Sequence, residues 1–224
     1  MITRLGSLNE FCWMDLKTRE VSRTAAFFAD VLGWEFAEDE EDWRRAVRIS
    51  ADGHGIGGVS DLSAGIYPPG TPAHVAYYLA VEDVDRRTRA ATDHGARLVV
   101  PPFDAGDQGR VATLLDPGGA AFSLWQPYGF AGWHHPPGVP GTPYRMVLAC
   151  QQPERARQFY RATTGAPLAH ADFVTAPRDA SGPPQWELVL TVDAPPARAR
   201  PVGDATWRLT SPEGLTFRLQ LPGT

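Results

Sequence analysis

The sequence is poor in cysteine and in long apolar runs, which argues against a disulfide-rich protein and against a membrane-spanning one. Its 224 residues include two cysteines, Cys12 and Cys150, too few for a disulfide framework and without ligands at metal-motif spacing, so buried thiols are expected. No apolar run approaches the ~20 residues that cross a bilayer, and the N-terminus lacks a secretory signal. A cytoplasmic protein without a membrane partner is therefore expected.

Positive charge is scarce as well. The chain carries 21 Lys and Arg against 26 Asp and Glu, a net charge of −5 at pH 7, and so lacks the basic excess that holds phosphate backbones. Nucleotide motifs of the GxGxxG or P-loop type are also missing. Neither nucleic acid nor a cofactor is therefore predicted.

The sequence does contain an internal repeat. DPGGAAFSLWQP (116–127) and SPEGLTFRLQLP (211–222) share Pro, Gly, Phe, Leu and a closing Pro at identical spacing. Residues 11–36 align without gaps with residues 143–168, and each segment changes from a strand to helical spacing that ends at a glycine suited to a left-handed helix end. The period is far too long for a solenoid and predicts duplicated domains.

Apolar patterning divides the chain into four modules of the type βαβββ, the last two degraded. In the fourth module, PPARARPVGD occupies the place of the helix, and its two consecutive prolines indicate that the helix is reduced or lost. The modules predict an α+β fold with two domains of paired modules, residues 1–128 and a degenerate copy at 142–224, joined by a Pro- and Gly-rich linker at 129–141. The modules cover about 8–66, 72–128, 142–183 and 184–222.

These modules, the helix ending in FF...LGW and the closing DPGGAAFSLWQ resemble the vicinal oxygen chelate superfamily, which includes glyoxalase I, extradiol dioxygenases and bleomycin-resistance proteins. The resemblance is strong for residues 8–128 and weaker for 142–222. It implies that paired modules curl their sheets into a cup around a ligand. The four-module arrangement is similar to glyoxalase-like proteins of actinomycete natural-product pathways.

The resemblance also implies where a metal would be held. Metal-dependent members place His, Gln or Glu on the first strand of a module and Glu on its last strand. Indole and guanidinium groups offer no lone pair to a cation, so no metal is predicted, although a site made by Asp15, His74 and a third group stays open. The residues at the implied ligand positions are Trp13, Ala76, Ser123, Arg145 and Arg218.

Strand alternation places one set of side chains toward the implied cup. Aromatic walls around a few polar groups suit a flat, largely apolar ligand. Each of these aromatic residues could instead be an ordinary core residue. Asp15 could instead form a structural ion pair with Lys17, and His74 could lie exposed at the start of a strand. The predicted ligand-binding residues are Phe11, Trp13, Asp15, Trp43, His74, Tyr78, Ser123 and Trp125.

The sequence thus predicts metal-independent binding of a bulky aromatic molecule, an antibiotic or polyketide-like natural product, in the N-terminal cup. Its role would be resistance by sequestration or accessory service in antibiotic biosynthesis. A cofactor-independent oxygenase, cyclase or isomerase with Asp15 or His74 as general base is the alternative, followed by a metal-dependent lyase or dioxygenase. Whether the protein is an enzyme, and whether it is a homodimer, are left open.

Overall fold

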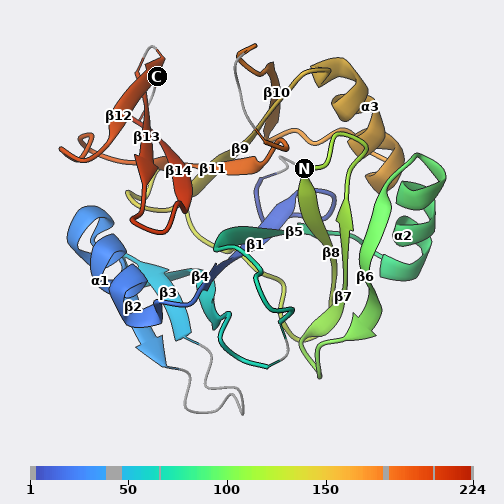
Figure 1. The fold of residues 1–224 in the computed structure, drawn as a ribbon, viewed down its shortest axis with the longest axis horizontal. Helices are drawn as coiled ribbons and strands as arrows, with labels where there is room; N and C mark the ends of the chain where they lie inside the picture. Colours follow the sequence, from blue (N-terminus) through green and yellow to red (C-terminus); the bar gives the residue numbers. More distant parts are fainter. Residues whose placement is uncertain (1–3, 39–46, 66, 179–181, 204, 223–224) are drawn as a thin grey trace. The chain divides into compact units, whose positions relative to one another are not determined.

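The computed structural model describes residues 4–38, 47–65, 67–178, 182–203 and 205–222. Residues 11–127 form one mixed sheet with strand order β2-β3-β4-β1-β5-β8-β7-β6 (Figure 1). Its elements are β1 (Phe11–Thr18), α1 (Val21–Leu32), β2 (Glu35–Glu38), β3 (Val47–Ala51), β4 (His54–Asp61), β5 (His74–Ala80), α2 (Val84–Asp93), β6 (Arg97–Asp104), β7 (Gly109–Leu115) and β8 (Ala121–Pro127).

Residues 143–220 form a second sheet with strand order β10-β9-β11-β14-β13-β12. The predicted α+β fold of tandem βαβββ modules is confirmed, and in the described parts of 184–222 no helix lies between β11 and β12. The elements are β9 (Pro143–Cys150), α3 (Pro153–Thr164), β10 (Ala171–Thr175), β11 (Trp186–Thr191), β12 (Arg200–Gly203), β13 (Thr206–Thr210) and β14 (Thr216–Gln220).

Backbone proximity divides the chain into two compact units, each of which takes segments from both halves of the sequence. Unit A holds Met1–Trp13, Tyr77–Trp133 and Arg145–Glu187. Unit B holds Met14–Ala76, His134–Tyr144 and Leu188–Thr224. The predicted domains, residues 1–128 and 142–224, correspond to the two sheets and not to these two units. Their boundaries stay a prediction.

The repeated turn has the same geometry in both copies. The Asp116 carboxylate accepts a hydrogen bond from the backbone N–H of Ala120 at 2.9 Å, and the Ser211 hydroxyl accepts one from Leu215 at 3.1 Å. Gly119 and the equivalent Gly214 have φ of 97° and 88°, where glycine is favoured. The predicted left-handed helix ends at Gly33 and Gly165 are confirmed, with φ of 68° and 81°.

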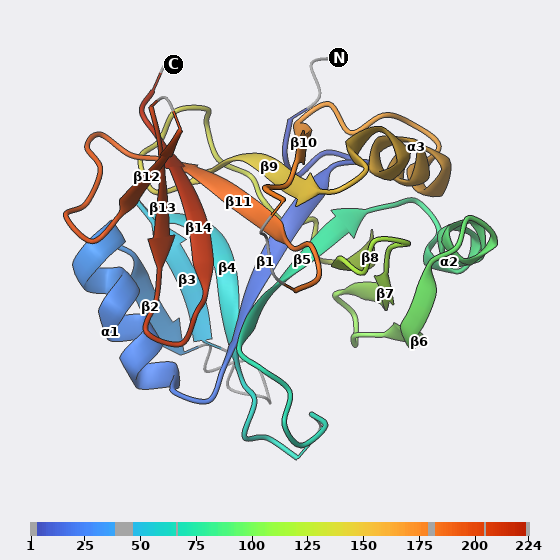
Figure 2. The ribbon, with the colours of Figure 1, turned by 45° about the horizontal axis from the view of Figure 1, so that its top comes forward.

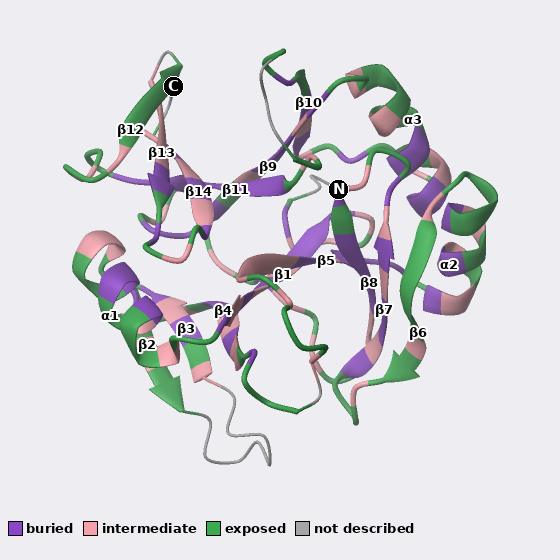
Figure 3. Ribbon diagram, viewed as in Figure 1, coloured by how far each residue is buried: buried purple, intermediate pink, exposed green. Residues whose placement is uncertain are grey.

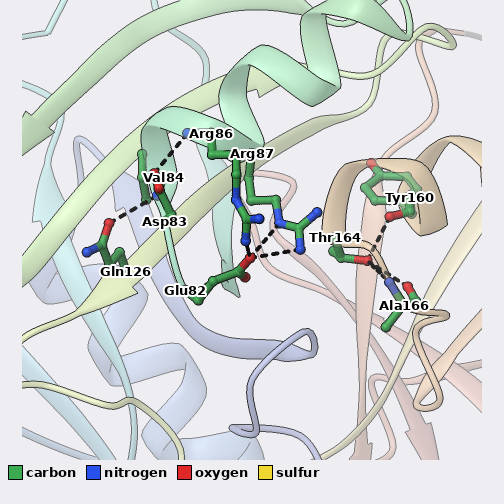
Figure 4. A network of polar contacts seen from close by, with 9 residues as sticks. All are labelled: Glu82, Asp83, Val84, Arg86, Arg87, Gln126, Tyr160, Thr164 and Ala166. Carbon is green, nitrogen blue, oxygen red and sulfur yellow. Dashed lines mark hydrogen bonds and ion pairs between the residues drawn. The ribbon is translucent and has the colours of Figure 1, made fainter.

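In unit A, α2 and α3 lie side by side (Figure 2). Figure 4 shows how α2 begins: the Asp83 carboxylate accepts from the Arg86 N–H at 2.9 Å, and the Gln126 side-chain oxygen accepts from the Val84 N–H at 3.0 Å. Such contacts satisfy N–H groups that have no partner within the helix. The second contact ties the start of α2 to β8, the strand that carries the candidate site.

The core of unit A contains a buried polar network. Tyr160 is in ring contact with Phe122, at 5.2 Å between centroids, and its hydroxyl donates to Asp116 at 3.2 Å and accepts from the Trp186 indole N–H at 2.8 Å. Asp116 is 5% exposed, and burial raises the pKa of its carboxyl above the ordinary value despite the hydrogen bonds that oppose the shift. The folded protein is therefore less stable when Asp116 is charged than when it is protonated.

The core of unit B is formed where α1 meets β14. The rings of Trp34, Phe28 and Phe217 are in mutual contact, with Trp34 at 5.1 and 5.3 Å from the other two centroids. The Trp34 indole N–H donates to the Gly141 carbonyl at 2.9 Å. The outer strand of the first sheet, β6, is exposed along nearly its whole length (Figure 3). Prolines 101 and 102 remove N–H donors from this edge, a common protection against pairing with other chains.

Two further expectations can be compared with the structure. Cys12 and Cys150 are free and buried, as predicted, and burial raises the pKa of both thiols. None of the described helices is both long enough and apolar enough to cross a membrane.

Replacing Asp116 with Asn is expected to remove part of the pH dependence of stability. Because the folded-state pKa of Asp116 is raised above its ordinary 3.8, the stability that this group contributes is fully present below that value and is lost as pH rises through the folded-state pKa. The free energy of unfolding of wild type minus that of Asp116→Asn, from urea denaturation, should therefore fall as the pH rises above about 4.

The exposed Asp93→Asn serves as the control for loss of one carboxylate. Glu10, whose pKa burial also raises, is present in both proteins and cancels in the difference. A difference that stays constant or rises with pH would contradict this account.

Candidate ligand-binding site

Four aromatic side chains of unit A form a connected group, here called the aromatic cluster: Trp13, Tyr78, Trp125 and Phe130. Trp13 meets Phe130 edge to face at 4.7 Å between centroids. Trp125 lies 6.1 Å from Tyr78 and 6.3 Å from Phe130 in the same kind of arrangement. All but Trp125 are only partly buried, so the cluster offers ring surface beyond its own packing.

Two features fix the position of Trp125, the innermost ring. Its indole N–H donates to the Phe130 carbonyl at 2.9 Å, which anchors the segment after β8. Gly109 on β7 lies against the ring: a Cβ there would overlap Trp125 and come within 2.7 Å of the Gln126 carbonyl. Only glycine leaves the room that this indole occupies.

Ser123 is the polar residue nearest to this arrangement in sheet register. It lies opposite Tyr78 in the parallel pair β5–β8, is 4% exposed, and shares a hydrogen bond of 2.9 Å with the Thr113 hydroxyl. One hydroxyl of this pair donates and the other keeps a proton for a further acceptor. The pair can therefore serve one ligand oxygen.

Phe11 differs from its expected position on the ligand face. It is fully buried, as is Cys12 beside it, and its ring lies 4.7 Å from Trp186 and 6.4 Å from Tyr77. The alternation predicted for β1 holds from Trp13 onward but not at the start of the strand, because Trp186 covers Phe11. Phe11 is a core residue of unit A.

Asp15 belongs to a polar network in unit B. Its carboxylate forms an ion pair with Lys17 and accepts from the Ser60 hydroxyl at 2.6 Å, while Lys17 Nζ donates to Ser60 at 2.9 Å and to the Tyr67 hydroxyl at 3.1 Å. Gly58, opposite Asp15 on β4, leaves space for the carboxylate. The structural pair with Lys17 that sequence reasoning weighed against catalysis is present.

The remaining two predicted residues contribute little to the described site. His74 is half-buried at the start of β5. Its Nδ1 lies 2.8 Å from the Pro72 carbonyl, so this ring nitrogen already has a hydrogen-bond partner two residues away. Trp43 lies outside the described residues. The predicted set is thus divided between the aromatic cluster with Ser123, the Asp15 network, and single residues elsewhere.

The side chains at the implied ligand positions do not supply the donor set of a divalent metal site. Trp13, Ala76 and Ser123 stand where the resemblance implies ligands. Within the described ranges, no three His, Cys, Asp or Glu side chains gather closely enough to hold a metal ion. In the second half, Arg145 forms an ion pair with Asp172 instead. These side chains supply aromatic surface and cations where a chelate would need oxygen or nitrogen lone pairs.

Sequence reasoning missed Phe130, Ser60 and Tyr67. Phe130 follows β8 in a segment read as linker, and only its spacing of five residues from Trp125 could have pointed to it. Ser60 could have been found by alternation along β4, whereas Tyr67 lies in a Pro- and Gly-rich loop without periodicity. None of the predicted residues lines the hollow of about 430 Å³ near the end of α1 or that of about 310 Å³ beside β13.

Comparison with known proteins identifies the family. The model of the Glyoxalase/Bleomycin resistance protein/Dioxygenase superfamily matches residues 11–124, which is more than half of the chain. The chain belongs to this superfamily. The resemblance predicted from the modules and the closing turn is thereby confirmed.

Two relatives and one solved structure illustrate the range of the family. CFP32 of Mycobacterium tuberculosis is 30% identical over 166 residues, covering 73% of this chain and 62% of CFP32, so the chain spans less than two thirds of that relative. The anthracycline biosynthesis protein DauV of Streptomyces sp. strain C5 is 30% identical over 202 residues, covering 85% and 70%. The Mn(II)-bound glyoxalase from Novosphingobium aromaticivorans shares the fold, with a TM-score of 0.62 at 13% identity, covering 98% and 83%.

Replacing Gly109 with Ala is expected to displace Trp125, because the new methyl group would overlap its ring. Overpacking of this kind typically costs ~1–3 kcal/mol, measured as a loss in the free energy of unfolding and accompanied by a changed near-ultraviolet circular dichroism spectrum. The control is Gly203→Ala, since no atom lies within 4 Å of a Cβ at that position. Equal stability and spectra for the two variants would show that Gly109 does not position the indole.

Proposed function

We propose that the aromatic cluster binds a bulky, flat aromatic small molecule of the polyketide type, without a metal ion. The observation that carries this proposal is the partly buried ring of Trp13, which stands at a position where metal-dependent relatives need a ligand atom. A ring there can stack on the ligand but cannot coordinate a cation. The neighbouring Tyr78, Trp125 and Phe130 extend the same apolar surface.

The chemistry of the cluster determines which molecules suit it. Stacking rewards extended planar rings, and the hydroxyl pair of Ser123 and Thr113 can orient one carbonyl or phenol oxygen. The similarity to DauV, an anthracycline biosynthesis protein, supports anthracycline-like polyketides as the ligand class. Binding such a compound would serve either sequestration of a toxic product or delivery of an intermediate during biosynthesis.

An anthracycline such as daunorubicin is expected to quench the intrinsic tryptophan fluorescence of the protein saturably. Trp13→Ala should weaken the affinity by ~10-fold, since stacking of a flat heterocyclic ring on an aromatic side chain is worth ~1–3 kcal/mol by alanine substitution. Tyr144→Ala, which removes an exposed aromatic of unit B, is the matched control and should bind as wild type does. No saturable quenching with any of a broad panel of aromatic polyketides would end the proposal.

The Asp15 network favours a second candidate function, cofactor-independent tailoring of an aromatic ligand by proton transfer. Lys17 donates to the Tyr67 hydroxyl oxygen, so the phenol proton points away from the lysine, and the ammonium polarises that O–H bond. Tyr67 can then donate to a ligand oxygen, while Asp15 and Ser60 hold the lysine in place. General acid catalysis requires such a positioned donor.

If this candidate is correct, Asp15→Asn and Tyr67→Phe should each lower the turnover of a polyketide substrate by ~100-fold or more, the usual size of a general acid–base contribution. Tyr144→Phe, a change at an exposed position of the same unit, should keep turnover. Chromatography of the reaction mixtures separates substrate and product. Unchanged turnover in Asp15→Asn and Tyr67→Phe would assign the network a purely structural role.

A further inference from the structure

The ligand face of unit A continues beyond the aromatic cluster to the outer strand β6. Val111 on β7 lies opposite Trp125 on β8 and opposite Phe103 on β6. Two residues further along β7, Thr113 lies opposite Val100 on β6. Because register partners in neighbouring strands project from the same face of a sheet, Val100 and Phe103 share the face of Trp125. These two residues are here called the β6 ledge.

Helix α2 covers the opposite face of these strands. Arg110 and Gln126 are register partners, and their side chains form hydrogen bonds with the first two residues of α2. Residues that alternate with them along β7 and β8, Trp125 among them, project away from the helix. The β6 ledge projects the same way, and Val100 is 36% and Phe103 49% exposed on a strand that is exposed along nearly its whole length (Figure 3). The ledge therefore offers apolar surface on the ligand face.

The chemistry of β6 favours a small planar ligand over an added strand as the occupant of the ledge. Pro101 and Pro102 lie between the two ledge residues and lack the N–H donors that strand addition needs. The register with β7 is also irregular on both sides of Val100. Exposed apolar surface marks interaction sites and ligand-binding grooves, and here it continues the face that carries the aromatic cluster. The same ligand can therefore extend over both.

We propose that the β6 ledge holds the distal end of the ligand, so that the site selects long, linearly fused polycyclic molecules over two-ring aromatics. Trp125 and Phe103 are two strand spacings of ~4.8 Å apart, or ~10 Å across the sheet, a span that a linear tetracycle covers and a two-ring compound does not. The Phe103 ring can pack edge to face on the last ring of such a molecule. This inference rests on the proposed function and names the ligand class of the same site.

Fluorescence titration of the whole chain with two ligands of different length tests the role of the ledge. The ligands are daunorubicin, which has four fused rings, and 5-hydroxy-1,4-naphthoquinone, which has two. Phe103→Ala should weaken daunorubicin binding ~5-fold, because one aromatic ring contact accounts for about that factor, and should leave the naphthoquinone affinity unchanged. Phe103→Tyr keeps the ring and should bind both compounds as wild type does.

Leu98→Ala is the matched control. Leu98 is an exposed apolar residue of the same strand, but it lies opposite Leu114 on the face that α2 covers, so this variant should bind both ligands as wild type does. An equal loss of daunorubicin affinity in Leu98→Ala and Phe103→Ala would overturn the proposal, because a general weakening of β6 would then explain both.

Failure of this inference can be told apart from failure of the proposed function. If wild type binds daunorubicin saturably and Phe103→Ala binds it equally well, or loses affinity for both ligands alike, the ledge does not select for ligand length and the proposed function stands. If wild type binds neither ligand, both are wrong. Light scattering tests a second copy of the chain as the occupant: a wild-type dimer that becomes monomeric in Phe103→Ala, with unchanged daunorubicin affinity, would also overturn the proposal.

Discussion

The alternation of side chains between the two faces of β8 and β14 determines which side chains of these strands can meet a ligand. On β8, Phe122 packs against Phe159 and Tyr160 of α3. On β14, Phe217 packs against Phe28 and Trp34. Because the side-chain period of a strand is two, the residues next to each phenylalanine must project from the opposite face. Only that face is left for ligands in either copy of the repeat.

The two copies have filled that face with opposite chemistry. After the Asp116 turn, β8 carries Ser123 and the Trp125 ring of the aromatic cluster. After the equivalent Ser211 turn, β14 carries Arg218. The turn hydrogen bonds are conserved between the copies, so the backbone that presents the residues is the same. The backbone therefore determines where these side chains lie. The side chain itself can be a metal ligand, an aromatic ring or a cation.

Local patterns predicted local structure well. The glycines at 33 and 165 end their helices because a left-handed residue is needed there, and the Asp15–Lys17 pair follows from two residues on one strand face. Phe11 could not be assigned in the same way, because Trp186, distant in the sequence, covers it. Phe130 and Tyr67 lie in irregular segments, where no period indicates which side chain points inward.

Lysine at position 17 suits the geometry of its partners. Lys17 is the only lysine in the sequence. Its side chain is 12% exposed, and its ammonium donates to three separate oxygens, those of Asp15, Ser60 and Tyr67. A single nitrogen with three N–H bonds matches oxygens arranged around one point, whereas a planar guanidinium spreads its donors along its edges. The one lysine of the chain therefore stands where three oxygens surround a single nitrogen.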